Sequence, residues 1–348
     1  MTDSDTCEIE STRTLFIHGG MHKTGSSAIQ RYLYEHLDHP TFEYLSAGRP
    51  NASNIVLEAF HSRLGDIPRY KTRMQTQEAL QSLRVNARNR FKKRMALTQK
   101  PNVILSAESF SLLNKDECTS LMAEVSKVFS VVKLVLYIRP VRPRVESAFQ
   151  QKLKIRFVEL EHKVRPSFRQ RIAKYDDIFG KENVIIRAYD PSNFPGGSVI
   201  NDFLAVVGLN IQVDSSPRAN VGLSLPAVQL LYVYRRQFQT AIPEDKKLIV
   251  ILGALNGDRF RMHQELLDRI LVDNDEDYHW LEQRTGISVS GVQRHADYAV
   301  REEQDLLDVP QSSLRWLQQQ QNDFQFTPER APDLQAIAEA LRKLALSS

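Results

Sequence analysis

Short apolar runs rich in strand-forming residues alternate with helix-like stretches through the first part of the chain. The strongest run is Val131–Ile138 (VVKLVLYI), and the other runs are Thr14–His18, Asn102–Ser106 and Asn183–Arg187. Continuous apolar runs of this length favour strands buried inside a parallel sheet. Helical periodicity between them marks Ser26–Leu37, Arg73–Ala96, Asp116–Phe129, Arg144–Arg156 and Phe168–Phe179. The alternation predicts an α/β three-layer sandwich with a mainly parallel central sheet.

From about Val221 the pattern contains helices alone. The expected helices are Leu223–Phe238, Phe260–Val272, Gly291–Leu307 and Leu334–Leu346. No Gly/Ser-rich linker separates the two halves. We therefore predict a polar tail, residues 1–13, and a single domain, residues 14–348. Within that domain, residues 14–208 form the α/β core and residues 209–348 form a mostly helical cover. Asp116 is expected to cap its helix, and Gly180 is expected to end the helix before it.

The composition is that of a soluble globular protein, since 42% of the 348 residues are hydrophobic and 25% are charged. Met1–Arg13 lacks the features of a signal peptide, and no run approaches the roughly 20 apolar residues of a membrane span. Cys7 and Cys118 lie too far apart in sequence to suggest a disulfide framework or a metal site. These features predict a cytoplasmic protein without stable membrane insertion.

Basic residues cluster between Arg63 and Lys100, where only Asp66 and Glu78 oppose them. Such a cluster either attracts anions or forms the solvated face of a long helix. No nucleic-acid module is recognisable and no aromatic residues interleave with the basic ones, so we predict no nucleic-acid partner.

The loop after the first predicted strand has the composition of an anion site. It reads HGGMHKTGSS from His18 to Ser27. A loop that leads into a helix offers free backbone N–H groups and the positive end of the helix dipole. Lys23 adds a charge, Gly25 allows close approach, and hydroxyl donors come from Thr24, Ser26 and Ser27. The alternative is a glycine turn and helix cap that bind nothing.

This loop departs from the nucleotide triphosphatase pattern, in which Lys and then Ser or Thr follow the last glycine. Here Ser26 follows Gly25, and Lys23 precedes it. A kinase also needs a carboxylate to hold magnesium. Ser106 and Arg139 are not acidic, and Glu108 is the nearest acidic residue. A P-loop small-molecule kinase using Mg–ATP and a non-catalytic anion- or polysaccharide-binding protein remain the alternatives.

The run Lys23–Ser27 after a strand resembles the 5'-phosphosulfate loop of sulfotransferases that use 3'-phosphoadenosine 5'-phosphosulfate (PAPS), especially bacterial members related to the carbohydrate enzymes. A second signature of that family is an arginine at a strand end with a serine eight residues later, which matches Arg139 and Ser147. The resemblance covers Thr14–Gly208 well and the remainder loosely. It implies a P-loop-like sulfotransferase fold, with Arg139 and Ser147 holding the 3'-phosphate. PAPS would be the donor, 3'-phosphoadenosine 5'-phosphate (PAP) the product, and no metal would be required.

Sulfuryl transfer requires a group that takes the proton of the acceptor. The family uses histidine or glutamate, and Glu108 follows the strand Asn102–Ser106 at the edge where the Lys23 loop is expected. Glu108 is therefore the predicted base. Its alternative role is to cap the next helix or to pair with an arginine. His22 is the competing base, and His18 is interpreted as structural.

The segment Pro217–Ser224 resembles a downstream stretch of bacterial relatives. Arg218 would close over the 3'-phosphate or the adenine; the alternative makes this segment a helix lead-in with Ser224 as its cap. Gln150, Gln151 and Lys154 are expected to line the acceptor cleft or to form plain surface. The predicted function is sulfuryl transfer from PAPS to a hydroxyl or amine of a sugar-containing or anionic acceptor, by in-line displacement. Residues 209–348 would form the acceptor side of the domain.

Overall fold

The computed structural model describes residues 12–21, 24–73, 76–165, 167–214, 222–272, 275–287, 298–327 and 332–347. These residues contain a five-stranded sheet in the order β2-β3-β1-β4-β5, and every neighbouring pair of strands is parallel. The strands are β1 (Thr14–His18), β2 (Phe42–Tyr44), β3 (Asn102–Ser106), β4 (Val131–Ile138) and β5 (Val184–Ala188). The α/β class and the parallel sheet are confirmed. The sequence did not indicate β2, because three residues are too few to carry a pattern.

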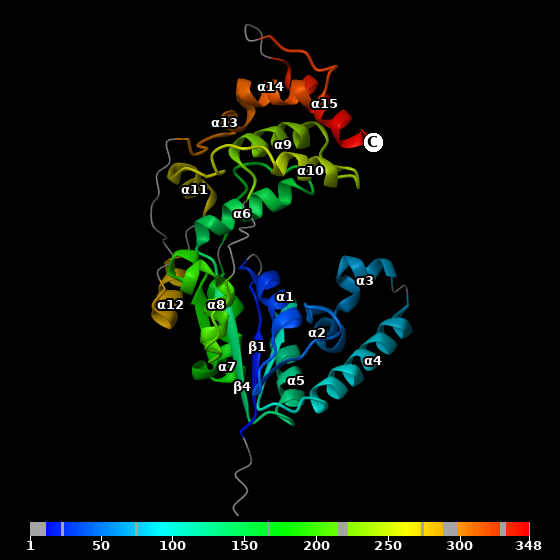
Figure 1. The fold of residues 1–348 in the computed structure, drawn as a ribbon, viewed down its shortest axis with the longest axis vertical. Coiled ribbons are helices and arrows are strands. Elements are labelled where there is room, and N and C mark those ends of the chain that lie inside the picture. Colours follow the sequence, from blue (N-terminus) through cyan, green and yellow to red (C-terminus); the bar gives the residue numbers. More distant parts are fainter. Residues whose placement is uncertain are drawn as a thin grey trace, which may run out of the picture. The chain divides into compact units, whose positions relative to one another are not determined.

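The register of the sheet brings the carboxyl ends of its strands to one edge (Figure 1). His18 at the end of β1 lies opposite Ser106 at the end of β3. Ile138 at the end of β4 lies opposite Ala188 at the end of β5. Ligands of open parallel sheets bind beyond such an edge. The edge therefore defines where the predicted site residues must meet.

Helices cover both faces of this sheet. One face packs Phe16, Val135 and Tyr137 against α1 (Ser26–His36) and α8 (Val199–Val206), and Phe203 of α8 is fully buried in this cluster. Because side chains alternate along a strand, Leu134 and Leu136 point to the opposite face. There they lie near Phe110, whose ring contacts those of α7 (Phe168–Phe179). The three layers of the prediction are thus present around the sheet.

The sheet belongs to the first of two compact units, which comprises Met1–Arg139, Ser167–Pro217 and Trp280–Ile287. Its remaining helices are α2 (Ser53–Phe60), α3 (Pro68–Arg73), α4 (Gln77–Ala96) and α5 (Lys115–Val125), with single 3-10 turns at Leu64–Asp66, Glu108–Leu112, Lys181–Asn183, Pro191–Asn193 and Pro195–Gly197. Gly180 ends α7 with φ at +80°, as predicted.

The expected cap of α5 was wrong by two residues. The side chain of Asn114, not of Asp116, accepts a hydrogen bond from the backbone N–H of Glu117. The carboxylate of Glu117 in turn accepts from the N–H of Asn114 at 2.9 Å. This reciprocal pair satisfies two donors at once, so it fixes the helix start earlier than a lone Asp116 would.

The second unit comprises Pro140–Pro166, Arg218–His279 and Ser288–Ser348. Its helices are α6 (Val141–Leu153), α9 (Leu225–Gln237), α10 (Asp245–Gly253), α11 (Gln264–Ile270), α13 (Glu303–Leu307), α14 (Gln311–Gln320) and α15 (Leu334–Leu346), while α12 (Asp275–Thr285) passes from this unit into the first. In the described part of the chain, no helix combines the length and hydropathy needed to span a membrane.

Helix α6 packs with the helices of the second half of the chain. The ring of Phe149 lies 5.5 Å from that of Phe260 and 6.2 Å from that of Tyr232, between centroids. The last turn of α6 is fixed by Arg235, which donates hydrogen bonds to the carbonyls of Leu153 and Lys154. The segment that sequence analysis placed in the α/β core is therefore part of the helical unit.

Candidate anion-binding site

The connection from β1 to α1 begins as an extension of the sheet. The N–H groups of Gly19 and Met21 donate to the carbonyls of Val135 and Tyr137 on β4, both at 3.0 Å. Gly20 has φ at +90°, and a Cβ there would lie 3.3 Å from the carbonyl oxygen of Glu108. The loop after β1 is thus held between β4 and the start of the turn after β3. Glu108 lies beside this loop, as the sequence predicted.

The start of α1 offers donors that the described part of the chain does not use. Gly25 is the residue before the helix, with φ at +78°, and no side chain caps the helix there. The first N–H groups of a helix have no carbonyl in a preceding turn. Ser26 is only 3% exposed, and its Oγ has no hydrogen-bond partner in the described residues. A buried hydroxyl without a partner at a helix N-terminus fits an anionic ligand.

The two neighbouring hydroxyl residues differ from Ser26. The hydroxyl of Thr24 is buried and donates to the carbonyl of Met21 at 2.6 Å, so its proton is already engaged. Ser27 is exposed at the second position of α1. His22, Lys23 and Arg218 lie outside the described residues, so their predicted roles stay predictions.

Tyr189 joins two of the predicted features. The guanidinium carbon of Arg139 lies 4.9 Å from the centroid of the Tyr189 ring. Cε2 of the same ring would lie 3.3 Å from a Cβ on Gly25. The Arg139 side chain and the start of α1 therefore meet at one aromatic ring. Sequence analysis missed Tyr189, although a residue directly after β5 belongs to the same edge of a parallel sheet.

Behind the site, His18 is fully buried, and its Nδ1 lies 2.8 Å from Oγ of Ser106. Burial lowers the pKa of His18 to about 4, and the nearby Glu108 carboxylate opposes this shift only in part. A histidine with this pKa is neutral at physiological pH. The geometry matches the structural role expected for His18.

Ser147 belongs to the second unit, on α6. The helix begins at Val141, three residues before the predicted start, because Pro143 is accommodated in its first turn. Ser147 is therefore about 9 Å along the helix from its first residue, farther than the single turn that the sequence suggested. Its pairing with Arg139 around one phosphate stays a prediction.

Two weaker expectations also have structural outcomes. Gln150 is buried, and its Oε1 accepts a hydrogen bond from the N–H of Leu223 at 2.8 Å. Ser224 caps α9, since its Oγ accepts from the N–H of Ala227 at 3.3 Å. The segment from Gly222 onward is therefore anchored on α6, and Gln150 serves the fold of the second unit.

Much of the basic cluster around α4 is engaged in contacts within the chain. Arg84 donates to the carbonyls of His61 and Ser62. Arg88 donates a hydrogen bond to Ser120 and lies over the Phe60 ring. Arg90 forms an ion pair with Glu58, and Lys92 forms one with Glu124. These contacts hold α4 against α2 and α5. They favour the interpretation as a helix surface over that of an anion-attracting field.

Together these features define an α/β protein with a candidate anion-binding site at the carboxyl edge of its parallel sheet. No family model matches the sequence. An uncharacterized protein of Archaeoglobus fulgidus is 26% identical over 152 residues, which span 42% of this chain and 42% of that protein. A crystal structure of a sulfotransferase from Alicyclobacillus acidocaldarius aligns with 59% of this chain and 85% of its own, at a TM-score of 0.33 and 16% identity. Similarity at these levels does not define a family for the chain.

Proposed function

We propose that this chain is a sulfotransferase that moves a sulfuryl group from PAPS to a hydroxyl or amine of a sugar-containing acceptor. The observation that carries the proposal is the start of α1. There the buried Ser26 hydroxyl has no hydrogen-bond partner in the described residues, and no side chain caps the helix at Gly25. Such a start suits the 5'-phosphate of the donor. The sequence resemblance of Lys23–Ser27 and of Arg139 with Ser147 supports the same donor.

A second cationic feature beside the first supports a ligand with two separated phosphates. Arg139 lies on the Tyr189 ring that also contacts the Gly25 region. A guanidinium presents planar donors that match phosphate oxygens. In the proposal, Arg139 holds the 3'-phosphate together with Ser147, and Arg218 closes over the nucleotide. PAP, the product, would be held by the same groups.

The proposed chemistry is a single in-line displacement. The bond from sulfur to the phosphate oxygen breaks as the bond from sulfur to the acceptor atom forms. Glu108, beside Gly20, takes the acceptor proton. Lys23 neutralises the charge left on the phosphate. His22 is the competing base, because it also belongs to the loop after β1.

The acceptor is proposed to be a sugar rather than a polyanion. The resemblance leans towards carbohydrate enzymes. The basic side chains that would have favoured a polyanion are largely paired within the first unit, with Arg90 on Glu58 and Lys92 on Glu124 as examples.

Thermal unfolding with nucleotides tests the donor. At about a hundredfold excess over Kd, PAP should raise Tm by roughly 4 °C, because it binds the folded state alone. Arg139→Ala should lose most of this shift relative to its own unliganded Tm. Arg63→Ala is the matched control, since that side chain is exposed in the same unit, and it should keep the shift. Stabilisation by Mg–ATP alone would instead support a kinase and overturn the proposal.

A further inference from the structure

The second unit contains a hollow of about 620 Å³ that the proposed donor site does not use. Its walls come from the segment after α6, from α9 and from the start of α13. Phe157 provides an aromatic surface and Gln239 an amide. The charged groups of the walls are the carboxylates of Glu159, Glu161 and Glu303 and the guanidinium of Arg236. This volume lies in the range of small-ligand sites, which combine an apolar surface with a few placed polar groups.

The walls are fixed by hydrogen bonds within the unit. The N–H of Phe157 donates to the carbonyl of Gln239 at 2.7 Å, and the N–H of Ala241 donates to the carbonyl of Ile155 at 2.8 Å. These two bonds pair the segment after α6 with the segment after α9. The Phe157 ring also lies 5.5 Å from the ring of Tyr232, which is fully buried on α9.

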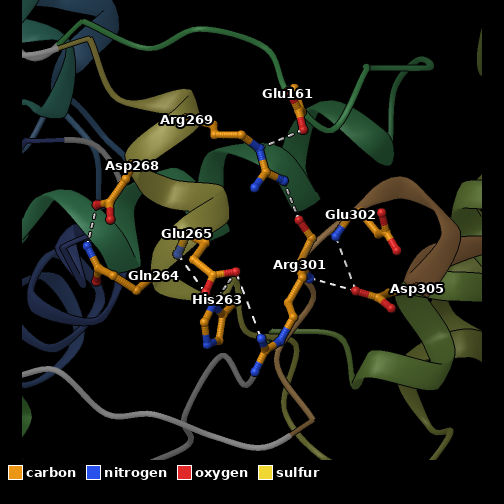
Figure 2. A network of polar contacts seen from close by, with 9 residues as sticks. All are labelled: Glu161, His263, Gln264, Glu265, Asp268, Arg269, Arg301, Glu302 and Asp305. Carbon is orange, nitrogen blue, oxygen red and sulfur yellow. Dashed lines mark hydrogen bonds and ion pairs between the residues drawn. The ribbon is translucent and has the colours of Figure 1, made fainter.

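Figure 2 shows the polar contacts that hold Glu161, one of the three carboxylates of the hollow. Arg269 of α11 donates to Glu161 at 3.0 Å and to the carbonyl of Arg301 at 2.5 Å. The N–H of Arg301 donates to Asp305 of α13 at 2.6 Å. Arg269 therefore joins the segment that carries Glu161 to the entry into α13. Hydrogen bonds therefore fix the position of this wall of the hollow.

The charges of the hollow are unevenly compensated. Glu303 accepts hydrogen bonds from the hydroxyl of Tyr232 at 2.7 Å and from Arg236 at 2.8 Å. Glu161 is paired with Arg269. In the part of the chain that the structure describes, Glu159 makes no side-chain hydrogen bond or ion pair. The carboxylate of Glu159, which is exposed at the rim of the hollow, is therefore the one negative charge not paired there, beside the half-buried ring of Phe157.

We propose that this hollow binds an ammonium group carried by a sugar-sized polar ligand, that is, an amino sugar. An aromatic face and an uncompensated carboxylate both attract a cation and repel an anion. Oxygens of Gln239, Glu161 and Glu303 accept hydrogen bonds from hydroxyl groups of the same ligand. If the proposed function holds, this amino sugar is a candidate for the sulfuryl acceptor. That identification rests on the proposed function, whereas the binding of the amino sugar does not.

Calorimetric titration of the full chain at mildly acidic pH, where sugar amines are protonated, tests the site. The two probes are a glucosamine tetramer and its fully N-acetylated form, which match in length but differ in charge. We expect the cationic tetramer to bind about tenfold more tightly, since a hydrogen bond to a charged group is worth about that factor. Equal binding of the two tetramers, tighter binding of the acetylated one, or no binding of either overturns the proposal.

Two variants assign the preference to this hollow. Glu159→Gln should remove most of the preference for the cationic tetramer. Phe157→Leu keeps the apolar bulk but removes the aromatic face, so it should lower the affinity for the cationic tetramer about threefold. Glu339→Gln changes an exposed carboxylate on α15 and should have no effect. A preference that survives Glu159→Gln contradicts the assignment.

Failure here is distinguishable from failure of the proposed function. If the cationic tetramer binds but PAP does not, the proposal that the hollow binds amino sugars is kept, and the identification of the ligand as a sulfuryl acceptor is rejected. If PAP binds and neither tetramer does, the donor site stands and the hollow does not bind amino sugars.

Discussion

At the scale of single residues, Gly25 combines two demands that can be separated by experiment. Its φ of +78° disfavours any side chain, and a Cβ would also lie 2.8 Å from Val199. Gly48 has a similar φ of +81°, but nothing lies within 4 Å of its Cβ position. Gly48→Ala therefore measures the conformational cost alone, about 1 kcal/mol or somewhat more.

Gly25→Ala should lower the free energy of unfolding by at least about 1 kcal/mol more than Gly48→Ala, because crowding adds to the conformational cost. It should also weaken PAP binding, since the Tyr189 ring lies beside the same position. Urea unfolding and titration with PAP measure the two effects. Equal destabilisation by the two variants would show that Gly25 is not closely packed.

His18 predicts a pH dependence of stability. Its pKa is about 4 in the folded protein against 6.5 ordinarily, so the unfolded chain binds the proton first as pH falls. The stabilisation is therefore complete above about pH 6.5 and is lost as pH falls towards 4, by roughly 3 kcal/mol in total. His18→Gln cannot titrate, so its free energy of unfolding should fall less over this range. Parallel pH curves for the two proteins would contradict the buried neutral histidine.

At the scale of elements, much of the first unit follows from local pattern. The strands Thr14–His18, Asn102–Ser106 and Val131–Ile138 and the helix Phe168–Phe179 have the predicted bounds. The two misses have different causes, of which the first is local in sequence and the second is tertiary. The cap of α5 depends on a reciprocal bond between Asn114 and Glu117, and β2 exists only through its pairing with β3.

A buried ion pair connects three helices of the second unit. Arg235 on α9 and Asp245 on α10 are 0% and 1% exposed, with 2.6 Å between nitrogen and oxygen, and Arg235 also bonds the end of α6. Asp245→Ala leaves the guanidinium buried without its partner, so it should destabilise the unit by about 3–5 kcal/mol.

The matched control is Asp323→Ala, which removes an exposed pair with Lys343 and should cost no more than about 1 kcal/mol. Guanidinium unfolding followed by the fluorescence of Trp316, in a Trp280→Phe background, reports on the second unit. Similar costs for the two variants would contradict a structural role for the buried pair.

At the scale of the whole molecule, the division of the chain was the least accessible to sequence reasoning. Nothing in the composition marks Arg139 as the end of one unit and Pro140 as the start of another. The partners that draw α6 into the helical unit, Tyr232 and Phe260, lie far downstream of Phe149. Contacts this distant in sequence leave no periodic signal in the segment itself.

The candidate site shows the same contrast. Glu108 lies beside the loop after β1, as strand order and sheet geometry predicted. Tyr189 was not predicted, because only the observed pairing of β4 with β5 brings it to Arg139. The position of Glu108 at the sheet edge was therefore predictable from the order of strand and loop, whereas that of Tyr189 needed the tertiary pairing. The roles of the predicted site residues stay predictions.

The central claim is that the chain binds a nucleotide through two separate phosphates, and the affinity ratio of PAP to AMP tests it most directly. AMP lacks the 3'-phosphate that Arg139 is proposed to hold. Calorimetric titration should give PAP an affinity at least about tenfold above that of AMP, and Arg139→Ala should remove this difference. Equal affinities for PAP and AMP in the unmodified chain, or a preference for Mg–ATP over PAP, would contradict the account.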